Sequence, residues 1–209
     1  MDYDYLLKFL ALGNSGVGKT SFLYRYTEGT FNPRFHSTVG IDFKEKRLVY
    51  ESSKGETRRV RLQLWDTAGQ ERFRSLTTGF YRESMGFFLV FDLTNEQSFL
   101  AVRGWLQEIR MHAYCEQPDV ILCGNKSDLA NRRVISEIQA RELAQEHNMI
   151  YLEMSAATGQ NVSGAVDMLL DRVIRTIDRA VDHALVPYQK RRNCRQLEIR
   201  SASKPSCSC

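Results

Sequence analysis

Eight residues near the start of the chain constrain its fold and its ligand more than any other part of the sequence. Residues 13–20 read Gly-Asn-Ser-Gly-Val-Gly-Lys-Thr, a complete G-x-x-x-x-G-K-[ST] pattern between a strand-like run and a helix-like segment. Glycines in such a turn let backbone N–H groups converge on phosphate oxygens, and the following helix N-terminus favours the same anion. The pattern predicts a site in which Lys19 contacts phosphates and the Thr20 hydroxyl binds Mg²⁺. The phosphate-binding residues expected in this loop are Ser15, Gly16, Val17, Gly18, Lys19 and Thr20.

Length and charge indicate one domain followed by a basic tail. The chain has 209 residues and a net charge of +4, and from Pro187 onward six basic residues stand against Glu198 alone. The nearly neutral body argues against nucleic acid as a partner, whereas a basic tail suits an anionic membrane surface. No apolar run is long enough to span a membrane, and the N-terminus lacks the features of a signal peptide, so we expect a cytosolic protein. We expect a domain over 1–182 and a flexible tail over 183–209.

Apolar runs predict an α/β domain. Strand-like segments at residues 5–12, 86–92, 119–124 and 149–154 alternate with helix-like ones, which is typical of a parallel sheet. Two further strand-like segments, 39–50 and 58–65, are joined by a short polar link and predict a hairpin with one antiparallel edge strand. Apolar stripes predict helices over 99–109, after Thr94 or Asn95, and over 162–177, and a capping box at Ser136 predicts a shorter one.

A phosphate loop alone fits kinases, ATPases and GTPases equally, but three later motifs distinguish them. Asp66-Thr-Ala-Gly-Gln70 follows a strand, at the edge where open α/β sheets bind ligands. There Asp66 can hold Mg²⁺ through water and the Gly69 N–H can reach a γ-phosphate. In Asn125-Lys-Ser-Asp128, the Asp128 carboxylate can accept from N1–H and the 2-amino group of guanine, a pair of donors that adenine lacks. The Ser155-Ala156 pair closes the next strand and can bring a backbone N–H near guanine O6.

With these motifs the sequence resembles the Ras superfamily of small GTPases over about residues 4–182, and within it the Rab family. The similarity rests on residues 39–43, 62–71, 72–77, 80–82 and 89–94. It implies a P-loop small-GTPase domain whose six-stranded, mostly parallel sheet has one antiparallel edge strand and helices on both faces. A long hairpin and several short segments, among them Asp2-Tyr-Asp-Tyr5, resemble the Rab twenty-seven type of secretory granule and melanosome transport. The resemblance implies a switch that binds and hydrolyses GTP and, in the GTP form, recruits effectors for vesicle trafficking and exocytosis.

Residue roles follow from the same resemblance. Thr38 is similar to the switch threonine that ligates Mg²⁺ and senses the γ-phosphate, and Gln70 is similar to the residue that orients the attacking water. The implied metal ligands are therefore Thr20, Thr38 and Asp66. Ala157 stands where relatives usually have lysine, which removes one packing contact at the base. The guanine-binding residues implied are Phe31, Asn125, Lys126, Asp128, Ser155, Ala156 and Ala157.

Two loops, over about 31–40 and 69–79, are expected to become ordered with GTP and to relax after hydrolysis. Phe43, Trp65 and either Phe80 or Tyr81 are similar to the aromatic effector surface of Rabs, although ordinary core packing is the alternative interpretation. The resemblance implies effectors, an exchange factor, a GTPase-activating protein, Rab escort protein and GDP-dissociation inhibitor as partners.

The chain ends Ser-Cys-Ser-Cys, which is similar to Rab termini that receive two geranylgeranyl groups, here on Cys207 and Cys209. The alternative is a pair of free thiols. Prenylation implies a lipid anchor on the cytoplasmic face of vesicle or granule membranes, with a cytosolic pool. Two competing functions stay open, a P-loop kinase or ATPase and a non-hydrolysing nucleotide-dependent scaffold.

Overall fold

The computed structural model describes most of the chain, in two parts. The described residues are 3–33, 38, 40–52, 55–68, 74–115 and 117–201, with backbone alone for 74–78 and 182–201. Contacts within the chain divide it into Met1–Asp171 and Arg172–Cys209. The sites for nucleotide, cation and effector considered below lie in the first unit, whereas Cys207 and Cys209 belong to the second.

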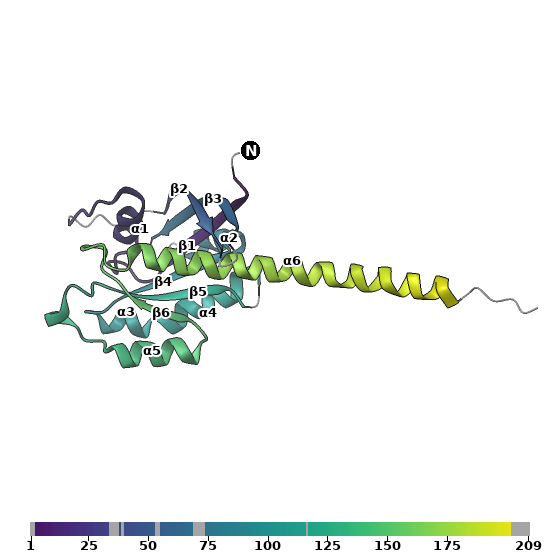
Figure 1. The fold of residues 1–209 in the computed structure, drawn as a ribbon. Coiled ribbons are helices and arrows are strands. Elements are labelled where there is room, and N and C mark those ends of the chain that lie inside the picture. Colours follow the sequence, from purple (N-terminus) through teal and green to yellow (C-terminus); the bar gives the residue numbers. More distant parts are fainter. Residues whose placement is uncertain are drawn as a thin grey trace, which may run out of the picture. The chain divides into compact units, whose positions relative to one another are not determined.

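A six-stranded sheet forms the centre of the first unit (Figure 1). Its spatial order is β2-β3-β1-β4-β5-β6, and among the described strands only β2 and β3 pair in antiparallel fashion. The predicted hairpin and edge strand are therefore confirmed. The strands are β1 (Tyr5–Leu12), β2 (Ile41–Glu51), β3 (Thr57–Thr67), β4 (Gly86–Asp92), β5 (Asp119–Asn125) and β6 (Ile150–Glu153).

Helices cover both faces of the sheet, as Figure 1 shows. One face carries α3, α4 and α5 together with the buried side of α2, and the other carries α1 and residues 162–171 of α6. The helices are α1 (Lys19–Glu28), α2 (Arg74–Glu83), α3 (Glu96–Leu100), α4 (Val102–His112), α5 (Glu137–Glu146) and α6 (Val162–Ser201), with a 3-10 turn at Ala130–Arg132.

Capping residues set two helix starts as predicted. The Asn95 side chain accepts from the Ser98 N–H at 3.2 Å, which begins α3. Ser136 and Gln139 form a reciprocal capping box at the start of α5. The single helix predicted over 99–109 is instead divided into α3 and α4 by a turn at Ala101, whose own backbone keeps right-handed helical angles (φ −70°, ψ −15°).

The burial of strand β4 explains why its sequence does not alternate between apolar and polar residues. All seven of its residues are buried, because both faces of this central strand are covered by helices. On one face the Phe88 ring packs edge-on against Phe9 and Phe22, with centroids 5.9 and 5.1 Å away. On the other face Phe87 and Phe91 join the cluster that includes apolar residues of α4 and α5. The core thus holds the strand ends, and the loops that follow them, in place.

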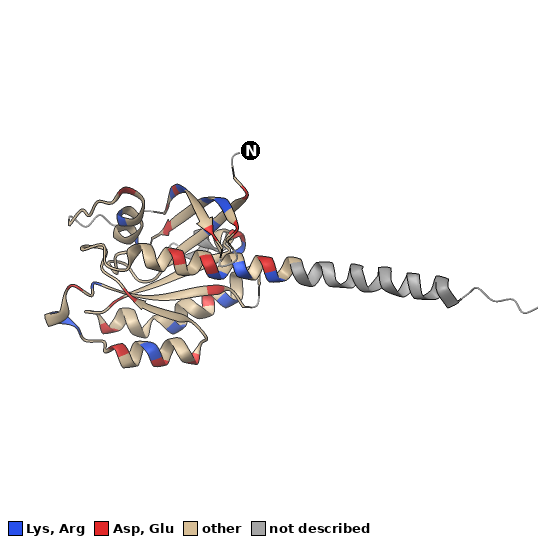
Figure 2. Ribbon diagram, in the orientation of Figure 1, with Lys and Arg blue, Asp and Glu red and all other residues tan. Residues whose placement is uncertain are grey.

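Charged residues of both signs are interspersed along α4 and α5, as Figure 2 shows. Arg141 and Glu137, one turn apart on α5, form an exposed ion pair at 2.5 Å, and Arg103 of α4 pairs with Glu146 of α5 at 2.7 Å. Such surface pairs contribute little to stability, about 0–1 kcal/mol each.

Helix α6 has helical backbone from Val162 to Ser201. The predicted tail, residues 183–209, begins inside this helix, so the division into a 1–182 domain and a tail stays a prediction. Cys207 and Cys209 lie outside the described residues, whereas Cys115 and Cys123 are free thiols. None of the helices in the described part of the chain is long and apolar enough to cross a bilayer.

Candidate functional site

The phosphate loop connects the end of β1 to the start of α1, where the motif predicts it. Gly13 has φ of +136°, and a Cβ atom there would lie 2.0 Å from the Val90 carbonyl oxygen. Gly18 has φ of +96°, and its Cβ would lie 2.3 Å from the side-chain nitrogen of Asn125. Glycine is required at both positions because the loop turns through left-handed backbone and lies directly against neighbouring strands.

Lys19 points its ammonium group back into this loop. Its Nζ donates to the carbonyl oxygens of Gly13 at 2.8 Å and Asn14 at 3.0 Å, and the residue is 5% exposed. Burial lowers the pKa of Lys19 to about 8, although the negative charge of Asp66 acts to raise it. A buried cation held by neutral carbonyls gains from an anion, so this position favours phosphate oxygens.

Beside Lys19, three oxygen-bearing side chains from three segments converge. The Thr20 hydroxyl lies 2.8 Å from the Thr38 hydroxyl and 2.5 Å from Asp66 Oδ2, and Thr38 is 3.0 Å from the same oxygen. Asp66 Oδ1 is buried and has no hydrogen-bond partner among the described residues. Burial raises the pKa of Asp66, while the two hydroxyls and Lys19 act in the opposite direction. A small, hard divalent cation fits this set of oxygens and the unsatisfied carboxylate.

The guanine motif follows β5 and is hydrogen-bonded to the phosphate loop. Asn125 is 1% exposed, and its Nδ2 donates to the Val17 carbonyl at 2.8 Å while its Oδ1 accepts from the Ala156 N–H at 3.1 Å. The Ser155 hydroxyl donates to Asp128 Oδ1 at 2.5 Å. Asn125 therefore joins the phosphate loop to the 155–157 loop, and Ser155 orients the carboxylate predicted to bind the base.

Four other predicted residues, Lys126, Ser15, Gly16 and Phe31, lie at the rim of the site. Lys126 has φ of +68°, and its ammonium pairs with Asp92 Oδ2 at 2.6 Å, which fixes its side chain across the end of β4. Ser15 and Gly16 are exposed at the top of the phosphate loop, whereas the Val17 side chain is buried in the core. Phe31 is 38% exposed, as a residue that packs on a ligand would be without it. Gly69 and Gln70 lie outside the described residues.

Three of the four predicted effector-surface aromatics form a contiguous cluster. The ring centroids of Phe43 and Trp65 are 5.0 Å apart, and those of Trp65 and Phe80 are 4.8 Å apart. Phe43 is 41% exposed. The prediction that Tyr81 belongs to this surface is wrong, because Tyr81 is 2% exposed and packs against Phe87 inside the core. Phe80, the preceding residue of α2, is partly buried at the edge of the same core, where its ring contacts Trp65.

Sequence reasoning missed two side chains that support the site. Trp105 of α4 donates from Nε1 to Asn14 Oδ1 in the phosphate loop at 2.7 Å. Arg25 of α1 donates from Nε to the Ala156 carbonyl at 2.9 Å. Both pairs are about 90 residues or more apart in the chain, and no local pattern indicates such contacts.

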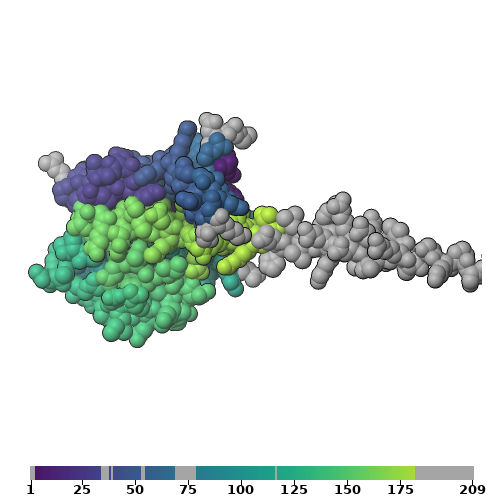
Figure 3. Space-filling view, viewed as in Figure 1, coloured from purple at the N-terminus to yellow at the C-terminus, as the bar shows by residue number. Residues whose placement is uncertain are grey.

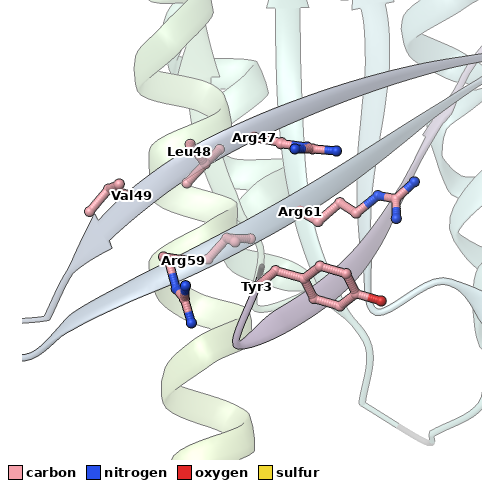
Figure 4. Close-up of a pocket in the computed structure, with 7 residues that line it drawn as sticks. Tyr3, Arg47, Leu48, Val49, Arg59 and Arg61 are labelled. Carbon is pink, nitrogen blue, oxygen red and sulfur yellow. The ribbon is translucent and has the colours of Figure 1, made fainter. Parts of the chain in front are cut away.

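A separate cavity of about 340 Å³ lies on the β2–β3 hairpin (Figure 4). Arg47 comes from β2 and Arg59 and Arg61 from β3, with the Tyr3 ring below Arg61. Arg59 pairs with Asp4 at 3.2 Å, and Arg61 pairs with Glu45 at 2.8 Å. None of the lining residues belongs to the phosphate or guanine motifs, so this cavity is distinct from the nucleotide site.

The phosphate loop, the hydroxyl and carboxylate cluster and the guanine motif at one edge of this sheet define a P-loop guanine-nucleotide-binding protein. The chain belongs to the Ras family, whose sequence model matches residues 8–175. It is similar to Rab-27A of Homo sapiens and of Mus musculus, each 60% identical over 191 residues that cover 89% of this chain and 86% of the relative. It is also 58% identical to Rab-27B of Homo sapiens, over 89% of this chain and 88% of the relative.

These similarities confirm the resemblance drawn from the motifs. The chain is a Rab-27-type small GTPase, an enzyme that hydrolyses GTP and a switch in vesicle trafficking. Membership of the family implies bound GTP or GDP and partners of the effector, exchange-factor, GTPase-activating and GDP-dissociation-inhibitor classes. The kinase, ATPase and scaffold alternatives are not favoured.

Proposed function

We propose that the chain binds Mg²⁺ with its nucleotide and that Thr20, Thr38 and Asp66 hold the ion. The observation that carries this proposal is the convergence of three oxygen-bearing groups next to the buried ammonium of Lys19. Mg²⁺ supplies charge neutralisation on the phosphate oxygens when bound. Thr38 belongs to a loop rather than to a strand or helix, so its hydroxyl can report whether a γ-phosphate is present.

We propose that the base is recognised by the 125–128 motif and the 155–157 loop, which Asn125 connects. The Asp128 carboxylate accepts from N1–H and the 2-amino group, and the Ala156 N–H donates to O6. Phe31 and the aliphatic stem of Lys126 pack on the faces of the base. Affinity for GDP, ADP and IDP, measured on the full chain, tests this assignment. We expect ADP to bind at least about 10³-fold more weakly than GDP, because a buried donor–acceptor set is left unpaired.

For hydrolysis, Gln70 is proposed to orient the attacking water, with the Gly69 N–H and Lys19 placed to stabilise charge on the transferred phosphoryl group. Single-turnover GTP hydrolysis by a Gln70→Leu variant tests the role of Gln70. We expect slower hydrolysis with unchanged GDP affinity. An unchanged rate would remove Gln70 from the mechanism.

The aromatic cluster Phe43, Trp65 and Phe80 is proposed as the effector surface. In the sequence its residues adjoin the two segments expected to respond to GTP, 31–40 and 69–79, the second of which includes the start of α2. The 41% exposure of Phe43 and the ring contacts within the cluster support this role. Effectors should then bind the GTP form through this cluster. Rab escort protein and GDP-dissociation inhibitor should bind the chain in connection with its prenylation. Capture of a purified Rab-27 effector by GTP-loaded and GDP-loaded chain, with and without Phe43→Ala, tests the surface.

We propose that two geranylgeranyl groups on Cys207 and Cys209, with the basic residues after Pro187, anchor the chain to vesicle or secretory granule membranes, on the cytoplasmic face. Two lipid chains give stable attachment where one is marginal. Fractionation of cells that express the full chain tests the anchor. The Cys207→Ser/Cys209→Ser double variant should move to the cytosolic fraction, and its retention on membranes would contradict the proposal.

A further inference from the structure

Arg25, in the last turn of α1, links the helix of the phosphate loop to the 155–157 loop. Its Nε donates to the Ala156 carbonyl at 2.9 Å, and its Nη2 donates to the Ala157 carbonyl. Its Nη1 donates to the carbonyl of Gly29, the C-cap of α1, at 2.8 Å. Figure 3 shows the purple segment that contains α1 lying directly against the green segment of the first unit. Each guanidinium nitrogen therefore holds a different carbonyl oxygen.

These contacts hold the part of the loop that follows Ser155, whose own hydroxyl donates to Asp128 and accepts from the Thr158 N–H. Ala156 and Ala157 end in methyl groups, so their backbone must be oriented by other residues. The peptide group before Ala156 is held through its N–H by Asn125, and the one after it is held through its carbonyl by Arg25. The planar, pre-organised fork of arginine suits two adjacent carbonyls, whereas a lysine ammonium presents one flexible point charge.

The same guanidinium also lies near the other predicted wall of the base site. Its central carbon is 6.0 Å from the centroid of the Phe31 ring, a separation at which cations attract aromatic faces. Arg25 thus contacts the 155–157 loop on one side and Phe31 on the other.

We infer that Arg25 is a positioning residue for guanine, which holds the 155–157 loop so that the Ala156 N–H, which donates to Asn125 Oδ1, can be shared with O6 of the base. The inference deepens the proposed function and rests on its contact between Ala156 and O6. Arg25 itself donates to backbone carbonyls and not to the nucleotide. Its loss should therefore weaken binding through O6 rather than through the phosphates.

A comparison of two nucleotides isolates this role. Affinities of the full chain for GDP and for 6-thioguanosine diphosphate, which keeps N1–H and the 2-amino group but has a weakly accepting sulfur in place of O6, are measured in Mg²⁺ for the wild type and Arg25→Gln. We expect the variant to bind GDP about 10-fold more weakly and to bind the analogue less than about 3-fold more weakly, because the lost hydrogen bonds act through O6. Arg103→Gln, which removes an exposed arginine ion pair, is the matched control and should change neither affinity.

A merely structural role would give a different result. If Arg25→Gln weakens both nucleotides by the same factor, or leaves GDP binding unchanged, the inference is wrong. Arg25→Lys keeps the charge and should still show a selective, smaller loss for GDP, so it decides the question if the glutamine variant does not fold. A wild type that binds both nucleotides equally would contradict the O6 contact itself, and the role of Arg25 with it.

Discussion

Asn125 and Val17 are joined by a hydrogen bond of 2.8 Å from the Asn125 side-chain amide to the Val17 carbonyl, across 108 residues of sequence. Val17 belongs to the loop proposed to bind phosphate, and Asn125 opens the motif proposed to bind the base. The oxygen of the same side-chain amide accepts a hydrogen bond from the Ala156 N–H. One buried side chain therefore keeps the phosphate-binding and base-binding halves of the site in a constant relation.

Replacing Asn125 by alanine should weaken GDP binding by about 2–4 kcal/mol, which is about 30- to 700-fold. The Val17 carbonyl and the Ala156 N–H both lose their buried partner, and the two loops are no longer joined. The rate of GDP release measures the effect. Ser127→Ala is the control, since Ser127 lies in the same motif but its hydroxyl makes only an exposed bond to Gln160 at 3.4 Å. Equal rates for the two variants would show that Asn125 does not couple the loops.

Asp66→Asn should weaken the apparent Mg²⁺ affinity about 10- to 100-fold, because a neutral amide replaces a carboxylate whose buried oxygen has no partner among the described residues. Adding a chelator should speed GDP release from the wild type far more than from this variant. Asp42→Asn is a nearby control, because Asp42 lies opposite Asp66 on β2 and is exposed. A chelator response that survives in Asp66→Asn would exclude this carboxylate from the cation site.

Tyr81→Ala should lower the free energy of unfolding by about 3–5 kcal/mol, because it empties a buried aromatic site between α2 and β4. Phe43→Ala should cost less than about 1.5 kcal/mol, since that ring is 41% exposed. Urea unfolding at fixed GDP and Mg²⁺ concentrations checks both. A larger loss for Phe43 than for Tyr81 would reverse the assignment of surface and core.

Glu153→Gln should destabilise the protein at pH 7 by about 1–3 kcal/mol. Arg133 forms a bidentate pair with Glu153, at 2.8 and 2.5 Å, and Tyr151 donates to it at 2.9 Å. Arg133 first, and Tyr151 with it, holds the pKa of Glu153 below its ordinary value, 4.5. The stabilisation is therefore complete above pH 4.5 and is lost as pH falls through the lowered pKa.

Urea unfolding of the wild type and of Glu153→Gln from pH 7 to pH 3.5 measures the difference between their free energies of unfolding. This difference should become steadily smaller as the pH falls in the acid range. Glu146→Gln, which removes an exposed pair with Arg103, should cost less than about 1 kcal/mol at every pH. A Glu153 effect that is independent of pH would mean that packing, and not the carboxylate charge, is responsible.

Elements of the fold that are specified by residues close together in the sequence were predicted correctly. The bounds of β1 and β4 agree with the predicted segments residue for residue. In β4 the buried run is continuous, and in β1 an apolar run is interrupted only by Lys8. The capping box at Ser136 was equally readable, since its partner is three residues away. The interruption at Ala101 was not, because an apolar stripe continues through it and helical pattern alone does not register one broken turn.

Local patterns were enough to assign the class of site, because the phosphate loop, Asp66 and the 125–128 motif depend on residue types at short spacing. Which side chains act together depends on the packing of the whole domain. That packing buries Tyr81 in the core, leaves Phe80 partly buried at its edge, and brings Arg25 to Ala156 across 131 residues. The physical reason is that burial and long-range hydrogen bonds depend on how helices are rotated against the sheet, which no single segment of the chain records.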